Sequence, residues 1–512
     1  MPSDADILVY DIGTTSVKSA VFDSGGIMRL SVSEPYSTDY PKPGWAEQDP
    51  DQFWEAAVRG TRKMSAQAES SLGRSLRIEA VGMAGRMNGC LAVDSEGIPV
   101  YPELIHSDSR GGSQCGRIID ILGEEFLYAE TANRTNEHLS LSKILWLKDE
   151  APESFKRAAW FINAKDYLRF KLTGILGLTD YSDASLTGAF NLKKKSWSAE
   201  ILDGLGLSRS CFPELKNSTE IGGVLSADAA SALGLARGIP VSVGGGDAAC
   251  ASRGSGIGAE AESYISIGSS AWASMLAPSP VYDEKRRIQN FFDLDGRSCN
   301  ICVTLQCAGA ALDWAMDLLA GNAAKSSEGF RRIEAELEAV LPGSEGVMFL
   351  PYLMGERTPH WDSDARGAFI GLSLTGNPRT LLRAVYEGIS FGLKDITEVY
   401  DDLSMPAKSF ILLGGGIRSE FWRRMICDII GKPMLIHPIP NNGISLGAAM
   451  AAGVSVGIWK NLEAAAEAVN FTFEKIVPDA DASRYIPYFN IYRGIYGQLK
   501  PVFKQLAMVK DV

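Results

Sequence analysis

The feature that most constrains the fold is a layout that occurs twice along the chain. Residues 7–23, ILVYDIGTTSVKSAVFD, predict an apolar strand, a Gly-Thr-Thr turn and a second strand. Residues 263–276, SYISIGSSAWASML, repeat this order with a Gly-Ser-Ser turn. Each half also carries a glycine triplet between a predicted strand and a predicted helix, in VSVGGGD and in SFILLGGG. We therefore expect a duplicated fold with a nucleotide bound between its halves.

The turns of the two predicted hairpins carry groups that suit an oxyanion. Thr14 and Thr15 in the first, and Gly268 and Ser269 in the second, offer hydroxyls and backbone N–H groups within one small concavity. Asp11, at the end of the strand that precedes the first turn, can hold a divalent cation through water. The alternative is a pair of plain hairpins without a ligand.

A carboxylate follows the first glycine triplet at once. Glycines allow backbone conformations closed to other residues and let a ligand approach the main chain, so Asp247 after Gly244–Gly246 can face a cleft. The alternative is a tight turn whose aspartate only caps the next helix. No GxxxxGK[ST] motif occurs, and the glycines at 254, 256 and 258 do not match GxGxxG, which leaves the hairpins as the expected phosphate site.

Length and charge narrow the class of protein. A chain of 512 residues exceeds the size of one growing core, so two domains with a cleft between them are expected. The net charge of −12 argues against a nucleic-acid or anionic-membrane partner. The one basic run, Lys193–Lys195, is interpreted as a solvated hairpin turn.

Neither a targeting segment nor a membrane span is expected. The acidic N-terminus does not resemble a signal peptide, and the apolar segment 444–459 is too short to span a bilayer. We therefore expect a buried helix at residues 444–459 and a cytoplasmic protein.

The eight cysteines favour reduced thiols over a disulfide framework in a chain of this size. Cys299 and Cys302 form a CxxC pair, but CNICVTLQC alternates like a strand, which would place the two on opposite faces. A metal site there is therefore not expected.

Further segments predict structure more than chemistry. Residues 51–70 predict an amphipathic helix, and residues 139–174 predict two helices with a short strand between them. We assign Trp146, Trp160 and Phe161 to packing. In the long polar loop after residues 347–351 we assign Glu356, Arg357 and Asp364 to holding the loop in place rather than to binding a ligand.

Several motifs together resemble the FGGY carbohydrate kinases, over essentially the whole chain. YDIGTTSVKSAVFD resembles the first phosphate motif of that family, and the GGGD at 244–247 is similar to the motif that carries its catalytic base. LSKILWLKDEAPESFKRAAWFINAKDYLRFKLTG and LLGGGIRSEFWRRMICDIIGKPM resemble its two signatures. PYLMGERTPHWDSDARGAFIGL resembles the xylulokinase and gluconokinase branch rather than the glycerol kinase branch.

This resemblance implies an α/β fold of two ribonuclease H-like domains, of the actin and sugar-kinase superfamily, with a cleft between them. We expect a sugar-binding domain at residues 1–252 and a nucleotide-binding domain at residues 253–512. The implied reaction is ATP- and Mg²⁺-dependent transfer of a phosphoryl group to a sugar hydroxyl. The implied partners are a small sugar and ATP, and a homodimer is left open.

The resemblance also implies a role for individual residues. Asp247 matches the general base, and Asp11 matches the residue that orients Mg²⁺. The phosphate hairpins are matched by Thr14, Thr15, Gly268 and Ser269, and the lining of the adenine nucleotide site by Gly309, Gly414, Gly415, Gly416 and Ser419. The sugar-contacting segments contain Arg86, Met87, Asn88, Asp108 and Asp247.

The chain departs from the xylulokinase pattern on the sugar side. It has Met87-Asn88 where a xylulokinase has Met-His, Asp247-Ala248 in place of Asp-Asn, and the segment 105–110, IHSDSR, in place of a Leu-Trp-Asn-Asp segment. Asparagine can donate and accept hydrogen bonds as neutral histidine can, so a polyhydroxylated substrate is still expected. The interpretation is a xylulokinase-like kinase. The alternatives are a kinase for L-xylulose, a keto-gulonate, gluconate or a tetritol, and a catalytically silent nucleotide-dependent regulator.

Overall fold

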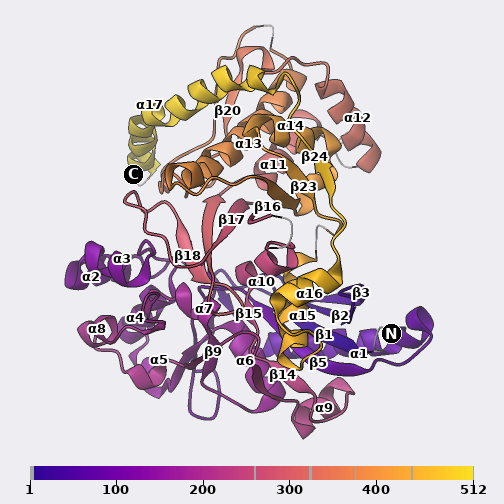
Figure 1. The fold of residues 1–512 in the computed structure, drawn as a ribbon. Coiled ribbons are helices and arrows are strands. Elements are labelled where there is room, and N and C mark those ends of the chain that lie inside the picture. Colours follow the sequence, from indigo (N-terminus) through magenta and orange to yellow (C-terminus); the bar gives the residue numbers. More distant parts are fainter. Residues whose placement is uncertain (1–4, 259–260, 322–325, 375, 440–441, 511–512) are drawn as a thin grey trace.

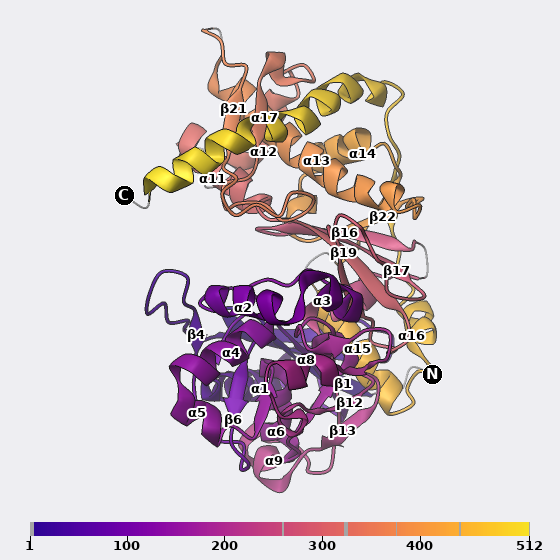
Figure 2. The same cartoon turned by 90° about the vertical axis from the view of Figure 1, so that its left-hand side faces the viewer.

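The computed structural model describes residues 5–258, 261–321, 326–374, 376–439 and 442–510, which form two α/β lobes (Figure 1). The first half of the chain, indigo to magenta, builds the lower lobe, and most of the second half builds the upper one. Two helices of the second half, α15 (Gly443–Ser455) and α16 (Leu462–Val469), lie with the lower lobe in both views (Figures 1 and 2). The predicted fold of two α/β domains is confirmed. The boundary predicted between residues 252 and 253 stays a prediction.

The lower lobe is built on a mixed sheet with the order β13, β14, β5, β1, β2, β3, in which β15 pairs with the end of β5. β1 is antiparallel to β2 and parallel to β5. The strands are β1 (Asp6–Ile12), β2 (Ser16–Asp23), β3 (Met28–Pro35), β5 (Ile78–Gly85), β13 (Ile221–Val224), β14 (Pro240–Ser242) and β15 (Gly245–Gly246).

The upper lobe is built on a second mixed sheet with the order β18, β19, β17, β16, β22, β23, β24. β16 is antiparallel to β17 and parallel to β22. The strands are β16 (Ser263–Ile267), β17 (Ala271–Ala277), β18 (Gln289–Phe292), β19 (Cys299–Leu305), β22 (Phe410–Leu413), β23 (Met434–Ile436) and β24 (Glu474–Ile476).

The two sheets confirm the duplicated hairpins, whereas the two glycine turns follow strands in different places. The hairpins β1–β2 and β16–β17 occupy matching places, each with a parallel strand on its other side. The first glycine triplet follows β14, which is separated from β1 by β5. The second follows β22, which pairs with β16 directly. The local pattern of strand, turn and helix does not contain strand order, because long-range pairing sets that order.

Helices cover both sheets (Figures 1 and 2). In the first half of the chain they are α1 (Asp51–Leu72), α2 (Gly112–Leu122), α3 (Glu124–Thr131), α4 (Ser140–Glu150), α5 (Pro152–Arg157), α6 (Ala164–Thr173), α7 (Tyr181–Ser185), α8 (Ala199–Gly204), α9 (Ala227–Leu233) and α10 (Asp247–Gly254). In the second half, besides α15 and α16, they are α11 (Gly309–Leu319), α12 (Ser327–Leu337), α13 (Pro378–Asp402), α14 (Glu420–Ile430) and α17 (Ile486–Lys510). The helix predicted at 51–70 is confirmed.

Short strand pairs complete the lobes. They are β4 (Glu47–Gln48) with β7 (Glu103–Leu104), β6 (Leu91–Val93) with β8 (Trp160–Ile162), β9 (Leu178–Asp180) with β12 (Glu214–Lys216), β10 (Phe190–Asn191) with β11 (Ser196–Trp197), and β20 (Met348–Leu350) with β21 (Ala368–Ile370). The basic run 193–195 lies in the β10–β11 turn, as predicted. The segment 139–174 folds as α4, α5, β8 and α6, so one short helix was not predicted.

Two helices that cross in contact fix the start of α10 relative to the lower sheet. A Cβ atom on Gly447 of α15 would lie 1.9 Å from the carbonyl oxygen of Cys250, and one on Gly254 would lie 1.8 Å from that of Gly443. On its other side α15 packs on the sheet, where Leu446 and Met450 share a buried cluster with residues of β1. Glycine at the crossing is required because any side chain would push the two backbones apart.

The predicted packing residues behave as expected. Trp146 and Phe161 are 8% and 7% exposed within the main core, and Trp160 packs partly buried against a smaller cluster. All eight cysteines are unpaired, and Cys299 and Cys302 belong to different core clusters. Among the described residues, no helix is both long enough and apolar enough to cross a membrane.

The long loop after β20 is held by backbone hydrogen bonds. Oε1 of Glu356, a residue only 4% exposed, accepts the N–H groups of Gln306 (2.8 Å) and Arg357 (2.7 Å). These two bonds support the structural role assigned to Glu356, while its Oε2 is buried without a hydrogen-bond partner among the described residues.

Candidate active site

Three strand ends of the lower sheet bring the predicted catalytic residues to one edge. In the parallel register, Asp11 of β1 lies opposite Ala84 of β5, and Ala84 lies opposite Gly245 of β15. Neighbouring strands lie about 4.8 Å apart, so the ends of β1 and β15 lie about 10 Å apart across β5. Asp247 follows β15 directly, and Arg86 follows β5 directly.

Asp247 is the first residue of α10 and is half-buried. Its Oδ1 accepts the N–H of Ala248 at 2.8 Å. Burial raises the pKa of Asp247 to about 6, against the opposing effects of the Ala248 N–H and of the Arg86 guanidinium. A carboxylate of this pKa is ionised at neutral pH and is basic enough to accept a proton from a hydroxyl as it reacts.

Asp11 lies in the same electrostatic environment as Asp247. Burial raises the pKa of Asp11 to about 7, the Lys18 ammonium lowers it, and the carboxylate of Asp247 raises it further. Its Oδ2 accepts a long hydrogen bond from the hydroxyl of Ser445 in α15 (3.4 Å). A carboxylate whose ionisation is opposed by burial and by a second carboxylate is stabilised when a cation lies beside it.

The segment after β5 contains the predicted sugar-contacting residues Arg86 and Met87, and the two side chains have different surroundings. Arg86 is 3% exposed, and its guanidinium donates to Gly13 O, to Tyr36 Oη (2.8 Å) and to Glu103 Oε2 (2.6 Å). Arg86 therefore ties the first hairpin to the sugar-side segment. Met87 is buried against the glycine turn, since a Cβ atom on Gly246 would lie 2.5 Å from its Sδ.

Asn88 presents a free polar acceptor in this segment. Its backbone has φ 63°, its carbonyl oxygen accepts from Nζ of Lys143 (2.6 Å), and its Oδ1 is buried with no hydrogen-bond partner among the described residues. A buried acceptor of this kind requires a partner, such as a hydroxyl of a bound sugar.

Asp108 is buried and already engaged. Its Oδ2 accepts from the backbone N–H of Ala46 (2.7 Å) and from Arg110 Nε (2.9 Å), and its Oδ1 accepts from the backbone N–H of Arg110 (3.1 Å). The structure therefore brings Asp108 to the sugar-side segment but directs its carboxylate into the protein.

Two histidines that the sequence analysis did not single out lie on the sugar side. Nδ1 of His106 and Nδ1 of His138 are buried without hydrogen-bond partners among the described residues. Burial lowers the pKa of His106 to about 3, and the cationic groups of Arg86, Lys143 and Arg357 lower it further. A neutral imidazole with one free nitrogen can bind a hydroxyl. For His106, the sequence offered a signal, because the segment 105–110 that contains it departs from the family pattern.

The turns of the two hairpins are open at their tips. Thr15, Gly268 and Ser269 are exposed, and Thr14 is half-exposed. The Gly268 and Ser269 carbonyls accept the N–H groups of Gly309 (2.9 Å) and Ala308 (2.9 Å). The second hairpin therefore meets the start of α11. The N–H of Gly268 donates to the carbonyl oxygen of Ser270 (2.9 Å), and the Gly268-Ser269 tip is exposed.

The second glycine triplet packs against the same hairpin. A Cβ atom on Gly414 (φ 97°) would lie 2.4 Å from the carbonyl oxygen of Ile267, and one on Gly416 would lie 2.7 Å from Cγ2 of that residue. A Cβ atom on Gly415 would meet nothing within 4 Å. Gly414 and Gly416 are thus required by packing, whereas Gly415 borders open space.

These segments enclose a cavity of about 710 Å³ in the upper lobe. Six predicted nucleotide residues line it, namely Gly268, Ser269, Gly309, Gly415, Gly416 and Ser419. Gly414 lies behind the lining, and Thr14 and Thr15 belong to the lower lobe. The size suits a nucleotide, because ligand pockets of this kind measure about 300–1,000 Å³.

The cavity also contains residues that sequence reasoning missed. They include Asp313 of α11, Phe330, Arg331 and Glu334 of α12, and Arg418. Glu334 is buried, and it accepts hydrogen bonds from Tyr386 Oη (2.9 Å) and from the hydroxyl of Ser419. α12 carries no motif in the sequence, so its place at the cavity depends on how it packs against α13.

Known protein families match both lobes. The model of the N-terminal domain of the FGGY family of carbohydrate kinases matches residues 7–254, and that of the C-terminal domain matches residues 263–456. These matches identify an ATP-dependent sugar kinase. The chain belongs to the FGGY family of carbohydrate kinases.

Individual relatives cover the whole chain. The xylulose kinase of Lactococcus lactis is 33% identical over 510 residues, 99% of either chain. The gluconokinase of Bacillus subtilis is 28% identical over 512 residues, 98% of this chain and 97% of the relative. The crystal structure of the ligand-bound xylulose kinase from Lactobacillus acidophilus has the same fold, with a TM-score of 0.90, 24% identity and coverage of 98% and 100% of the two chains.

Proposed function

We propose that the chain phosphorylates a hydroxyl of a small ketose of the xylulose type, with Asp247 as the general base. The observation that carries the proposal is the place of Asp247 at the ends of β1, β5 and β15, beside Asp11 and Arg86, with a pKa of about 6. A base needs this position and this pKa to take the proton of a sugar hydroxyl as the hydroxyl attacks the terminal phosphate of ATP.

The nucleotide would be held by the upper lobe. The cavity of about 710 Å³, bordered by the second hairpin and Gly415, supports a site for the adenine nucleotide lined by Gly309, Gly415, Gly416 and Ser419. Gly414 contributes to this site by packing against Ile267. In this proposal the phosphates meet Thr14 and Thr15 from one lobe and Gly268 and Ser269 from the other. Turns with exposed N–H groups and hydroxyls suit phosphate oxygens.

Asp11 would hold Mg²⁺ together with the phosphates of ATP. The residues present fit the ion, because Mg²⁺ in such sites is bound by one or two carboxylates, waters and substrate phosphates. The raised pKa of Asp11, about 7, reflects a half-buried carboxylate that a cation would stabilise. When bound, Mg²⁺ neutralises charge on the phosphates, while Asp11 orients it from the end of β1.

A second candidate substrate is an acid sugar such as gluconate. The cationic groups of Arg86, Lys143 and Arg357 lower the pKa of His106, whose Nδ1 has no hydrogen-bond partner among the described residues. Cationic groups beside a polyol site favour a carboxylate on the sugar. The gluconokinase among the relatives is consistent with this candidate.

A substrate panel tests the proposal. Release of ADP is measured with D-xylulose, L-xylulose, gluconate, a keto-gulonate and a tetritol, each against a blank without sugar. We expect one of these to raise turnover far above the blank. Turnover indifferent to every sugar would contradict the proposed function and favour a silent regulator.

The substitution Asn88→His tests what sets the sugar preference. The free Oδ1 of Asn88 lies where xylulokinases have a histidine, so we expect the variant to improve kcat/KM for D-xylulose relative to the other sugars by about 10-fold, the effect of one hydrogen bond. The measurement is the same panel applied to the variant. An unchanged order of preference would place selectivity elsewhere.

The substitution Gly415→Val tests the nucleotide site. Because a Cβ atom there meets no other atom, the variant should fold normally and place its side chain at the border of the cavity. We expect the KM for ATP to rise by about 10-fold or more, with the KM for the sugar nearly unchanged, since one branched side chain displaces part of the ligand. A KM for ATP equal to that of the unmodified enzyme would move the nucleotide away from Gly415.

The homodimer and the cytoplasmic location stay predictions from the sequence.

A further inference from the structure

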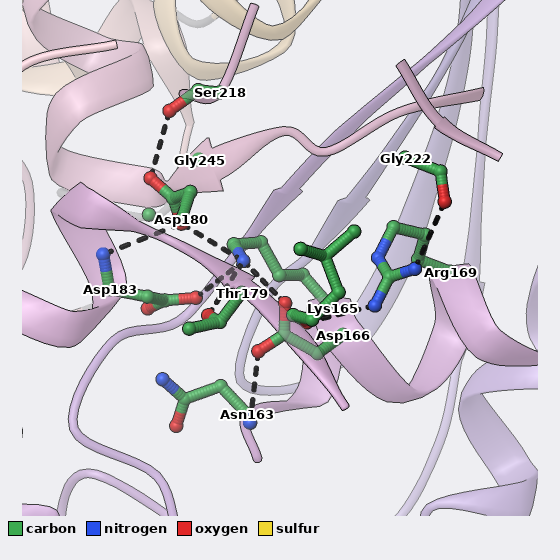
Figure 3. Close-up of polar contacts among 12 residues, drawn as sticks. Asn163, Lys165, Asp166, Arg169, Thr179, Asp180, Asp183, Ser218, Gly222 and Gly245 are labelled. Carbon is green, nitrogen blue, oxygen red and sulfur yellow. Dashed lines mark hydrogen bonds and ion pairs between the residues drawn. The ribbon is translucent and has the colours of Figure 1, made fainter. Parts of the chain in front are cut away.

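A buried ion cluster lies behind the first glycine turn (Figure 3). Nζ of Lys165 contacts three carboxylates: Asp166 Oδ1 at 2.6 Å, Asp180 Oδ1 at 3.0 Å and Asp183 Oδ2 at 3.0 Å. The four side chains are at most 1% exposed. Lys165 comes from α6, Asp180 from the end of β9 and Asp183 from α7, so the cluster joins three elements.

A serine connects this cluster to the turn. The hydroxyl of Ser182 donates to Asp180 Oδ2, and its oxygen accepts the backbone N–H of Gly246 at 2.8 Å. The hydroxyl proton of Ser182 is donated to the Asp180 carboxylate. The lone pairs of the Ser182 oxygen therefore face the Gly245–Gly246 peptide, whose N–H they accept. The Asp180 carboxylate is in turn held by Lys165 and by the N–H of Ser182 (2.9 Å).

A second serine donates to the same carboxylate, and although its hydroxyl also lies against Gly245, it is not the acceptor of the Gly246 N–H. The hydroxyl of Ser218 donates to Asp180 Oδ2 at 2.8 Å, as Figure 3 shows. The link of Ser218 to the turn is its carbonyl oxygen, which accepts the N–H of Gly244 at 3.1 Å. Removal of the Ser218 hydroxyl therefore leaves its backbone bond to the turn in place.

The peptide at Gly246 is wedged between this network and apolar atoms. A Cβ atom on Gly245 would lie 2.2 Å from Cδ2 of Leu294, and one on Gly246 would lie 2.5 Å from Cγ of Met87. The N–H of Gly246 thus has one orientation that satisfies both packing and hydrogen bonding. A rotation of this peptide would shift the Asp247 carboxylate.

We propose that Ser182, oriented by the Lys165–Asp180 ion pair, is a positioning residue for Asp247, because it fixes the peptide N–H of Gly246. The inference rests on the function proposed above. Ser182 does not touch a reacting atom and acts through the backbone that carries the base. Misplacement of a reacting group by about 1 Å costs roughly 100-fold in rate, so a single hydrogen bond at this peptide can control turnover.

The test compares Ser182→Ala with the matched control Ser218→Ala. Both variants remove a hydroxyl donor to Asp180 Oδ2, but only the first removes the acceptor of the Gly246 N–H. We expect kcat to fall by about 10- to 100-fold in Ser182→Ala, with KM values for ATP and sugar within about threefold. Ser218→Ala should keep kcat within about threefold of the unmodified enzyme. Equal losses of kcat in both variants would overturn the positioning role.

The double variant Ser182→Ala/Asp247→Ala separates positioning from general damage. If Ser182 acts only through the base, its loss should lower the residual kcat of Asp247→Ala by less than about twofold. A further 10-fold loss in the double variant would contradict the inference.

Hydrogen exchange gives a readout that does not need turnover. Exchange of the Gly246 amide, followed by mass spectrometry on overlapping peptides, should be about 10-fold faster in Ser182→Ala than in Ser218→Ala. Unchanged exchange in Ser182→Ala would refute the contact itself.

An enzyme that phosphorylates no sugar would refute the proposed function, whereas an active enzyme whose kcat survives Ser182→Ala would refute only the positioning role. If Ser182→Ala does not fold, Asp180→Asn, which removes the charge that orients Ser182, is expected to lower kcat in the same way.

Discussion

Replacement of Asp247 by alanine should lower kcat by about 10²- to 10⁴-fold at pH 8, the usual contribution of a general base. The KM for ATP should change little, because the nucleotide cavity is lined by upper-lobe residues such as Gly268 and Ser419. The measurement is ADP release with the best sugar of the panel. Turnover that survives the substitution would contradict the assignment of the base.

The pH dependence of kcat/KM in the unmodified enzyme should report the ionisation of Asp247. Asp247 must be ionised to accept a proton, and burial places its pKa at about 6, so kcat/KM should fall as the pH drops below about 6.

The effect of Asp247 ionisation on the stability of the fold has the opposite sign. The pKa in the folded state lies above the ordinary value of 3.8, so ionisation of Asp247 costs stability as the pH rises from about 4 to about 6. Asp247→Asn should therefore be at least as stable as the unmodified enzyme at pH 8, which urea unfolding can check.

Replacement of Lys165 by methionine should lower the free energy of unfolding by about 3–5 kcal/mol at neutral pH, the usual cost when one partner of a buried ion pair is removed. The variant leaves Asp166, Asp180 and Asp183 facing one another without a cation. Burial already raises the pKa of Asp183, while Lys165 opposes that effect. Urea unfolding of the variant and the unmodified protein measures the difference.

The matched control for this substitution lies on the same helix. Lys171→Met in α6 breaks a surface pair with Asp51 (3.1 Å; side chains 30% and 54% exposed), so it should cost less than about 1 kcal/mol. The loss in Lys165→Met should shrink from pH 8 to pH 5, because buried carboxylates that lack a cation have raised pKa values and are relieved by protonation. Equal losses in the two variants would mean that the cluster contributes no more than a surface pair.

The predicted elements with a strong local signal are confirmed in the structure. The hairpin at residues 7–23, the helix at 51–70 and the buried helix near residue 450 follow from apolar periodicity and from turn residues that lie next to one another in the chain. The same local signal located both candidate carboxylates. Asp11 lies near the end of the apolar strand β1, and Asp247 directly follows β15.

The glycine turn recurs in each half of the chain as expected, but the place of each turn in its sheet did not follow from that local pattern. Both have the pattern of strand, glycines and helix, but β14 and β22 occupy different places in their sheets. Strand order depends on which distant segments pair, and no residue within either turn specifies its pairing partner.

The sequence alone determined the class of this protein and the positions of its chemistry-bearing turns, because those depend on neighbouring residues. Only the tertiary structure decided which groups meet: the carboxylate of Asp108 directed into the protein, α12 beside the cavity, and Ser182 at the peptide before Asp247. The Ser182–Gly246 bond joins residues 64 positions apart, and such a contact exists only after α7 and the glycine turn have packed together.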